Sequence, residues 1–137
     1  MTQIRPYSEA LSRLKEVGLR PTRQRMALAK LLFDRGDHHI TAEQLHTAAR
    51  NQNIPVSLAT VYNSLHQFKE VGILREVVVE AGRSYFDTNV SAHHHFFRPE
   101  AGELIDVPND AVNVSKLPNP PEGTKIESVN VIIRLSN

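Results

Sequence analysis

Three histidines in a row, His93, His94 and His95, are the side chains of this 137-residue chain that are best suited to bind a ligand. They follow a segment whose pattern predicts a strand, a turn and a second strand. Side chains of an extended strand alternate between its two faces, so His93 and His95 share one face and His94 points to the other. Two imidazoles on one face can share a metal ion. A polar strand exposed to water is the alternative.

Composition limits the chemistry in which these histidines can take part. The chain contains no cysteine, which excludes disulfides, thiolate zinc sites, iron–sulfur clusters and thiol redox switches. Any metal must therefore be bound by nitrogen and oxygen ligands. No apolar run approaches the roughly 20 residues of a membrane helix, and the polar start from Met1 to Arg5 is unlike a secretory signal. We therefore expect a cytoplasmic protein without a membrane partner.

Charge is distributed unevenly between the two halves of the chain. Residues 1–73 contain ten Lys and Arg against six Asp and Glu, whereas residues 74–137 contain six against nine. A basic first half and an acidic second half indicate that only the first half approaches a polyanion. Chance scatter of charges on a solvated surface would give the same counts.

Periodicity predicts four helices before any strand. Apolar residues recur at intervals of three and four in four segments, namely residues 7–17, 23–35, 42–51 and 58–71. Thr22 and Ser57 are suited to cap the second and fourth of these helices. Thr41 with Gln44 matches a capping box at the start of the third.

The period then changes to that of strands. Residues 73–79 and 83–87, separated by a turn at Gly82, predict a hairpin, and helices followed by such a hairpin make a winged helix. Later segments predict three more strands and a short helix, at residues 93–97, 103–107, 126–135 and 108–116 respectively. We therefore expect an α+β protein with an N-terminal winged-helix DNA-binding domain (residues 1–88) and a small α/β domain (residues 89–137). Three strands and one short helix can scarcely bury both faces of a sheet alone, which favours a homodimer.

The fourth helix has the composition of a helix that contacts DNA bases. If its apolar side, which includes Leu58, faces the core, five residues cluster at its exposed N-terminal end: Ser57, Ala59, Thr60, Tyr62 and Asn63. Asn63 can pair with adenine, Ala59 and Thr60 can pack on a thymine methyl, and Tyr62 can stack on a base or reach a phosphate. Three arginines near the second helix would bind the DNA backbone: Arg20, Arg23 and Arg25. A polar helix face with surplus arginines is the alternative.

Several of these segments together resemble one family. Residues 18–25, 37–45, 58–65 and 82–87, with the histidine run after them, are similar to successive motifs of the ferric uptake regulator family. Within it, the lack of cysteine and the segment His93–Phe97 resemble the iron response regulator branch, which responds to haem. The resemblance implies DNA contacts from Tyr62 and from the arginines around Thr22. Asn63 departs from it, because members generally have arginine there.

The resemblance also implies a metal site. The regulatory site that the family forms between its domains matches five residues of this chain: His39, Asp87, His93, His95 and Asp106. The spacing from Asp87 to His93 is one residue shorter than usual. Such a set of nitrogen and oxygen ligands suits iron, manganese or zinc. The structural zinc site of the family needs cysteines, and its second regulatory site needs ligands where this chain has Asn113 and Val129, so we expect neither.

The resemblance then implies a function. We expect an iron- or haem-responsive transcriptional regulator that binds double-stranded promoter DNA as a dimer and is released or inactivated by haem. The run His93, His94 and His95 would hold one or two axial positions of the haem iron. The alternative is a divalent-metal-dependent co-repressor that does not sense haem, and a haem or metal carrier is a further one. We do not expect an enzyme, because no nucleophile, general base or phosphate-cradling glycine loop accompanies the ligands.

Overall fold

The computed structural model describes residues 8–137, and their side chains from residue 9 onward. Tyr7, which was predicted to belong to the first helix, and the polar start from Met1 to Arg5 lie outside the described residues. The chain divides into two compact units, Met1–Val90 and Ser91–Asn137. This division falls two residues after the predicted domain boundary.

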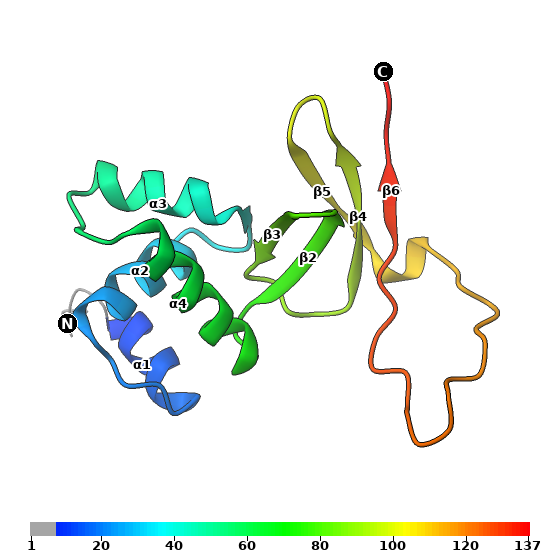
Figure 1. Ribbon diagram of the computed structural model, residues 1–137, viewed down its shortest axis with the longest axis horizontal. Helices are drawn as coiled ribbons and strands as arrows, with labels where there is room; N and C mark the ends of the chain where they lie inside the picture. Colours follow the sequence, from blue (N-terminus) through cyan, green and yellow to red (C-terminus); the bar gives the residue numbers. More distant parts are fainter. Residues whose placement is uncertain (1–7) are drawn as a thin grey trace, which may run out of the picture. The chain divides into compact units, whose positions relative to one another are not determined.

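The first unit contains the four predicted helices (Figure 1). They are α1 (Ser8–Glu16), α2 (Arg23–Phe33), α3 (Ala42–Asn51) and α4 (Leu58–Glu70). Helix α2 contacts the other three. Their apolar sides form one core, in which Leu28, Leu45 and Phe68 have no exposed surface. Burial of such side chains is the main stabilising contribution to this unit.

The helix starts follow the predicted caps. The side chain of Thr22 accepts a hydrogen bond from the Arg25 amide at 3.2 Å, and that of Ser57 accepts one from the Thr60 amide at 3.1 Å. At α3 the capping box is complete, since the Gln44 amide donates to Thr41 Oγ1 and the Thr41 amide donates to Gln44 Oε1. Each cap satisfies an amide that has no partner within its helix.

A three-stranded antiparallel sheet completes the first unit, in the order β1-β3-β2. Its strands are β1 (His39–Ile40), β2 (Arg75–Glu80) and β3 (Arg83–Asp87). The hairpin from β2 to β3 is the predicted one, and Gly82 supplies the positive φ of 71° that its turn requires. Lys69 near the end of α4 forms a 2.7 Å salt bridge to Glu76 on β2, which ties the hairpin to that helix. Helices and hairpin together have the architecture of a winged helix.

The second unit is a smaller sheet in the order β5-β4-β6 (Figure 1). Its strands are β4 (His93–Arg98), β5 (Glu103–Pro108) and β6 (Ile132–Arg134). The described part of this unit contains no α-helix. Strand β4 pairs antiparallel with β5 and parallel with β6. The paired strands bury Phe97, Leu104 and Val107.

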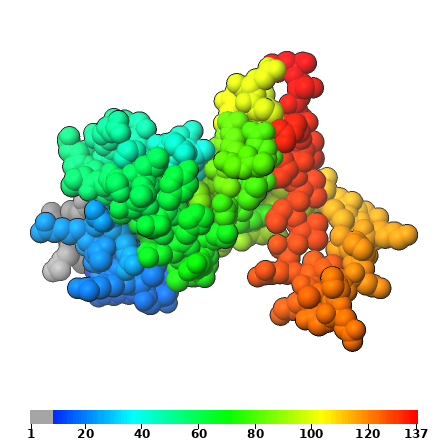
Figure 2. Space-filling view, viewed as in Figure 1, coloured from blue at the N-terminus to red at the C-terminus, as the bar shows by residue number. Residues whose placement is uncertain are grey.

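Two predictions for this unit are wrong in extent. The helix predicted over residues 108–116 is a single 3-10 turn, Asn109–Ala111, because a short segment containing β-branched Val112 and Val114 is a poor helix former. The strand predicted over residues 126–135 is only Ile132–Arg134, the part that pairs with residues 95–97 of β4. The segment between them, drawn in orange in Figure 2, is largely exposed.

No helix within residues 8–137 is both long enough and apolar enough to cross a membrane.

Candidate metal ligands and nucleic-acid interface

Strand pairing in the second unit brings three of the predicted metal ligands together. His93 and His95 lie on one face of β4, with their ring centroids 4.5 Å apart. Asp106 on β5 is paired with His95 on β4, and directly opposed residues of an antiparallel pair share a face. One oxygen, Asp106 Oδ1, lies 3.2 Å from His93 Nε2 and 3.3 Å from His95 Nε2. The ligand atoms of all three residues lie within 4.8 Å of one another.

Hydrogen bonding fixes which nitrogen of His93 is available to a metal. His93 Nδ1 lies 2.7 Å from the carbonyl oxygen of Ser91, so it carries the hydrogen and donates it. In neutral His93 the Nε2 lone pair then faces an oxygen of the Asp106 carboxylate. The electron pairs of this nitrogen and this oxygen repel each other, so a proton or a cation between them is stabilising. A backbone carbonyl behind Nδ1 is also the usual second partner of a metal-binding histidine, and the residues therefore fit a divalent metal.

The other two predicted ligands lie together in the first unit. His39 on β1 is paired with Asp87 on β3, and their side chains approach at 3.4 Å between His39 Nε2 and Asp87 Oδ2. Asp87 is only 1% exposed, and its Oδ1 accepts a hydrogen bond from the Asn89 amide at 2.9 Å. A carboxylate so deeply buried needs compensating charge or hydrogen bonds. The five predicted ligands thus form two groups, one in each unit.

His94 has a different partner from its two neighbours. The amide of Val131 donates to His94 Nδ1 at 3.1 Å, and the same residue's carbonyl accepts from the His95 amide at 3.2 Å. These bonds hold the segment before β6 against β4. His94 is 5% exposed, and its ring serves the packing of the sheet. The predicted alternation of the three histidines is therefore present, and it separates His94 from the His93 and His95 pair.

The start of α4 presents most of the side chains that were predicted to contact bases. Ser57, Ala59, Tyr62 and Asn63 are exposed and Thr60 is half-buried, whereas Val61 has no exposed surface. The prediction that Leu58 faces the core is wrong, since this residue is 36% exposed. It is the first residue of the helix and extends beyond the core that α2 and α3 cover.

Tyr62 has a partner that sequence reasoning missed. Its hydroxyl donates a 2.6 Å hydrogen bond to Oε1 of Glu43, in the first turn of α3. This bond lowers the pKa of the Glu43 carboxyl and raises the pKa of the Tyr62 phenol. Because the hydroxyl is bonded to a carboxylate, which repels phosphate, the ring of Tyr62 is the part suited to contact DNA.

The three predicted backbone-binding arginines differ in their surroundings. Arg20 and Arg23 are exposed, whereas Arg25 is half-buried. Arg25 donates to Gln67 Oε1 from Nε at 3.2 Å and from Nη2 at 3.0 Å, and to the Arg20 carbonyl from Nη1 at 3.0 Å. A shallow groove beside these residues, between the start of α2 and α4, is lined by Arg20, Thr22, Gln24, Thr60, Asn63 and Gln67, among others.

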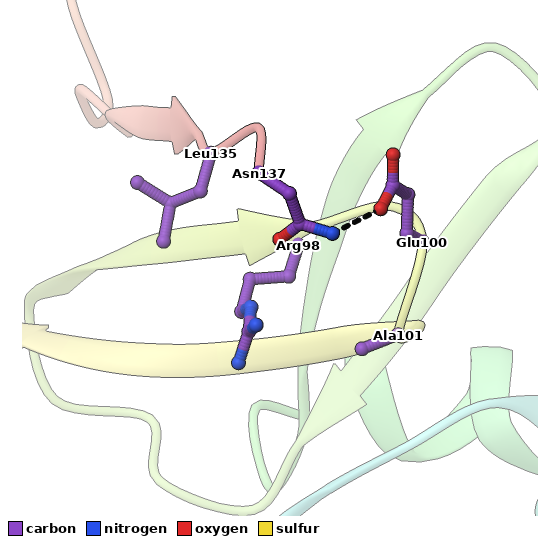
Figure 3. Close-up of a pocket in the computed structure, with 5 residues that line it drawn as sticks. All are labelled: Arg98, Glu100, Ala101, Leu135 and Asn137. Carbon is purple, nitrogen blue, oxygen red and sulfur yellow. Dashed lines mark hydrogen bonds between the residues drawn. The ribbon is translucent and has the colours of Figure 1, made fainter.

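A further pocket lies at the other end of β4 from His93 (Figure 3). Arg98, Glu100, Ala101, Leu135 and Asn137 line it, and the Asn137 amide donates to the Glu100 carboxylate. Its cation, Arg98, is paired with Glu103 at 3.2 Å. This pocket contains none of the predicted metal or DNA residues.

The fold and these side chains define a winged-helix protein with histidine and aspartate ligands of the kind that bind divalent metals. The sequence profile described as the ferric uptake regulator family matches residues 16–134. The chain belongs to the ferric uptake regulator family. Because this is a family of regulators, membership also confirms the prediction that the chain is not an enzyme.

Individual relatives agree with this assignment. The chain is 33% identical over 98 residues to the peroxide-responsive repressor PerR of Staphylococcus aureus, an alignment that covers 72% of this chain and 66% of that protein, just under two thirds. The ferric uptake regulator of Pseudomonas aeruginosa with manganese is similar in structure (TM-score 0.70, 23% identity, 93% of this chain and 97% of the other). The Vibrio cholerae ferric uptake regulator gives a TM-score of 0.73 at 24% identity, covering 92% and 98%. These similarities confirm the predicted α+β fold class.

Proposed function

We propose that this chain is a divalent-metal-dependent transcriptional regulator that binds promoter DNA as a homodimer. The observation that carries the proposal is the convergence of His93 Nε2 and His95 Nε2 on one oxygen of Asp106. Family membership and the manganese named with the Pseudomonas aeruginosa relative support it.

The proposed metal ligands are the two groups described above, His93, His95 and Asp106 with His39 and Asp87. Imidazole nitrogens and carboxylate oxygens suit Fe²⁺, Mn²⁺ or Zn²⁺. The ion would supply positive charge between donor atoms that otherwise face one another with lone pairs. The side chains supply the rest of the specificity, because strand register and the Ser91 carbonyl fix the direction of the imidazoles.

The proposed DNA-binding domain is the winged-helix domain predicted at residues 1–88. Its fourth helix exposes Tyr62 and Asn63 near its N-terminal end, where helices of this class meet base edges. The exposed Arg20 and Arg23 supply charge for the phosphates. The DNA-binding domains named for the Vibrio cholerae relative, and the repressor named for the Staphylococcus aureus one, support this role.

The proposed dimerisation domain is residues 89–137. Large apolar side chains of this domain remain between 36% and 53% exposed at six positions: Val90, Ile105, Val114, Leu117, Ile126 and Val129. Exposed apolar groups gathered in so small a domain are typical of a protein interface. A second copy of the chain would cover them and would place two DNA-binding domains on one duplex.

Haem sensing is a second hypothesis within this proposal. It depends on the resemblance to iron response regulators, and imidazole is a competent axial ligand of haem iron. The relatives favour the divalent metal, since manganese is named for one of them. In addition, His93, His94 and His95 are each 6% exposed or less, which leaves little surface for a large planar ligand.

A retention assay tests the main function. The probe is a duplex selected by the wild-type protein from a randomised library, and it is compared with a shuffled duplex of the same composition. We expect Mn²⁺ to tighten binding to the selected duplex roughly 5- to 150-fold relative to protein treated with EDTA, the usual range of coupling between two sites. Equal binding with Mn²⁺ and with EDTA would contradict metal dependence, and equal binding to both duplexes would contradict sequence recognition. Release by added haem would support the second hypothesis, and its absence would reject it.

Asn63 is expected to determine which base pair α4 prefers. An asparagine side chain pairs with adenine, whereas an arginine pairs with guanine, and each good pair discriminates by about 1–3 kcal/mol. Asn63→Arg is therefore expected to move the preference from adenine towards guanine at one position of the selected sequence, by roughly 5- to 150-fold. The measurement is a repeated selection with the variant. As a control, Asn51→Arg adds the same charge at an exposed position of α3 and should leave the base preference unchanged. If both variants select the same DNA sequence as the wild-type protein, Asn63 does not contact the bases.

A further inference from the structure

Arg25 stands apart from the other arginines near α2 because its guanidinium is bonded inside the protein. Three of its five N–H groups donate to protein acceptors, two to Gln67 Oε1 and one to the Arg20 carbonyl. Its backbone is also fixed, since its amide donates to the capping hydroxyl of Thr22. The half-buried side chain therefore has one defined direction.

These bonds connect α2 both with α4, which is distant in sequence, and with the turn just before α2. Gln67 is on α4, 42 residues from Arg25, and the Arg20 carbonyl is in the turn that leads into α2. The planar guanidinium can reach both acceptors at once because its donors point in fixed directions. Arg25 thus sets the position of α4 relative to the turn that carries the exposed Arg20.

We propose that Arg25 is a positioning residue, which holds α4 and the Arg20 turn in register for DNA and does not itself contact phosphate. This role rests on the proposed DNA-binding function. It changes the prediction made from sequence, in which Arg25 was one of three equivalent phosphate contacts.

The role has a consequence for charge-conserving replacement. Arg25→Lys keeps the positive charge, but a single ammonium group cannot reproduce the paired donors towards Gln67 and the donor towards Arg20. We expect its affinity for the selected duplex to fall roughly tenfold, the size of a charge-assisted hydrogen bond. A phosphate contact would tolerate lysine. Gln67→Met removes the acceptor at similar volume and should cause a comparable loss, and the double variant should lose no more than either single one.

Salt dependence distinguishes positioning from phosphate contact. Removing one phosphate contact reduces the slope of log K against log salt by about 0.9. Arg25→Gln is expected to weaken binding without this change in slope. Arg23→Gln, which removes an exposed arginine two residues earlier, is the matched control and should show the change.

Each result of this experiment decides a different point. Binding is measured with Mn²⁺ present and only on variants that far-UV circular dichroism and thermal melting show to be folded. A change in affinity then does not result from unfolding of the variant. Unchanged affinity in Arg25→Lys, additive losses in the double variant, or a slope lowered by about 0.9 in Arg25→Gln each overturn the positioning role. Failure of the wild-type protein to prefer the selected duplex overturns the proposed function, and the positioning role with it.

Discussion

Replacing His95 with alanine is expected to weaken the binding of Mn²⁺ or Zn²⁺ by more than about 100-fold. Loss of even an outer-shell partner of a metal site costs about 10- to 100-fold in affinity, and His95 is proposed as a direct ligand. The remaining His93 and Asp106 would leave the ion with a smaller set of donors on this sheet. Competition with a chromophoric chelator, together with elemental analysis of the purified protein, measures the effect.

The same titration tests the rest of the ligand set. His66→Ala removes an exposed imidazole outside both ligand groups and should retain the wild-type affinity. His39→Ala tests the group in the first unit and should also weaken metal binding, because His39 is a proposed ligand. Wild-type affinity in His95→Ala would contradict the proposed site, and wild-type affinity in His39→Ala would confine the metal to His93, His95 and Asp106.

Local rules explain why most of the first unit could be predicted from sequence. The capping box of Thr41 and Gln44 involves residues three apart, and the buried positions of α4 recur at helical spacing. The short strand β1 was not predicted, because two residues have no measurable period. It exists because β3 offers it a partner, and this pairing sets His39 opposite Asp87. Part of the candidate site thus depends on a strand that only the folded chain reveals.

Hydrogen bonds between side chains of different helices could not be predicted from the sequence either, because they also depend on the folded chain. The bond from Tyr62 to Glu43 spans 19 residues and that from Arg25 to Gln67 spans 42, and no periodicity relates such positions. Both bonds change what a predicted DNA-contacting residue can do. The site in the second unit was easier, since alternation along β4 placed His93 and His95 together. Asp106 came from the family resemblance, and the register of β4 with β5 gives its physical reason.

Replacing Phe68 with alanine is expected to lower the free energy of unfolding of the winged-helix unit by about 3–5 kcal/mol. Phe68 has no exposed surface, and its ring lies 6.5 Å from that of Phe33 between α4 and α2. The substitution removes this contact and leaves a cavity that surrounding side chains fill only in part. A loss of this size is a large fraction of the about 5–15 kcal/mol that stabilises a typical domain.

Leu58 on the same helix is the control for this prediction. The apolar spacing of α4 gives Leu58 and Phe68 the same expected orientation, whereas the structure leaves Leu58 36% exposed. Leu58→Ala should therefore cost only about 1 kcal/mol, because part of this side chain already lies in water and no closed cavity is left behind. Urea titrations followed by far-UV circular dichroism compare the two variants. Equal losses would mean that both side chains are buried, as the apolar spacing of α4 predicts. A large loss only in Phe68→Ala would mean that the first residue of α4 lies outside the core formed with α2.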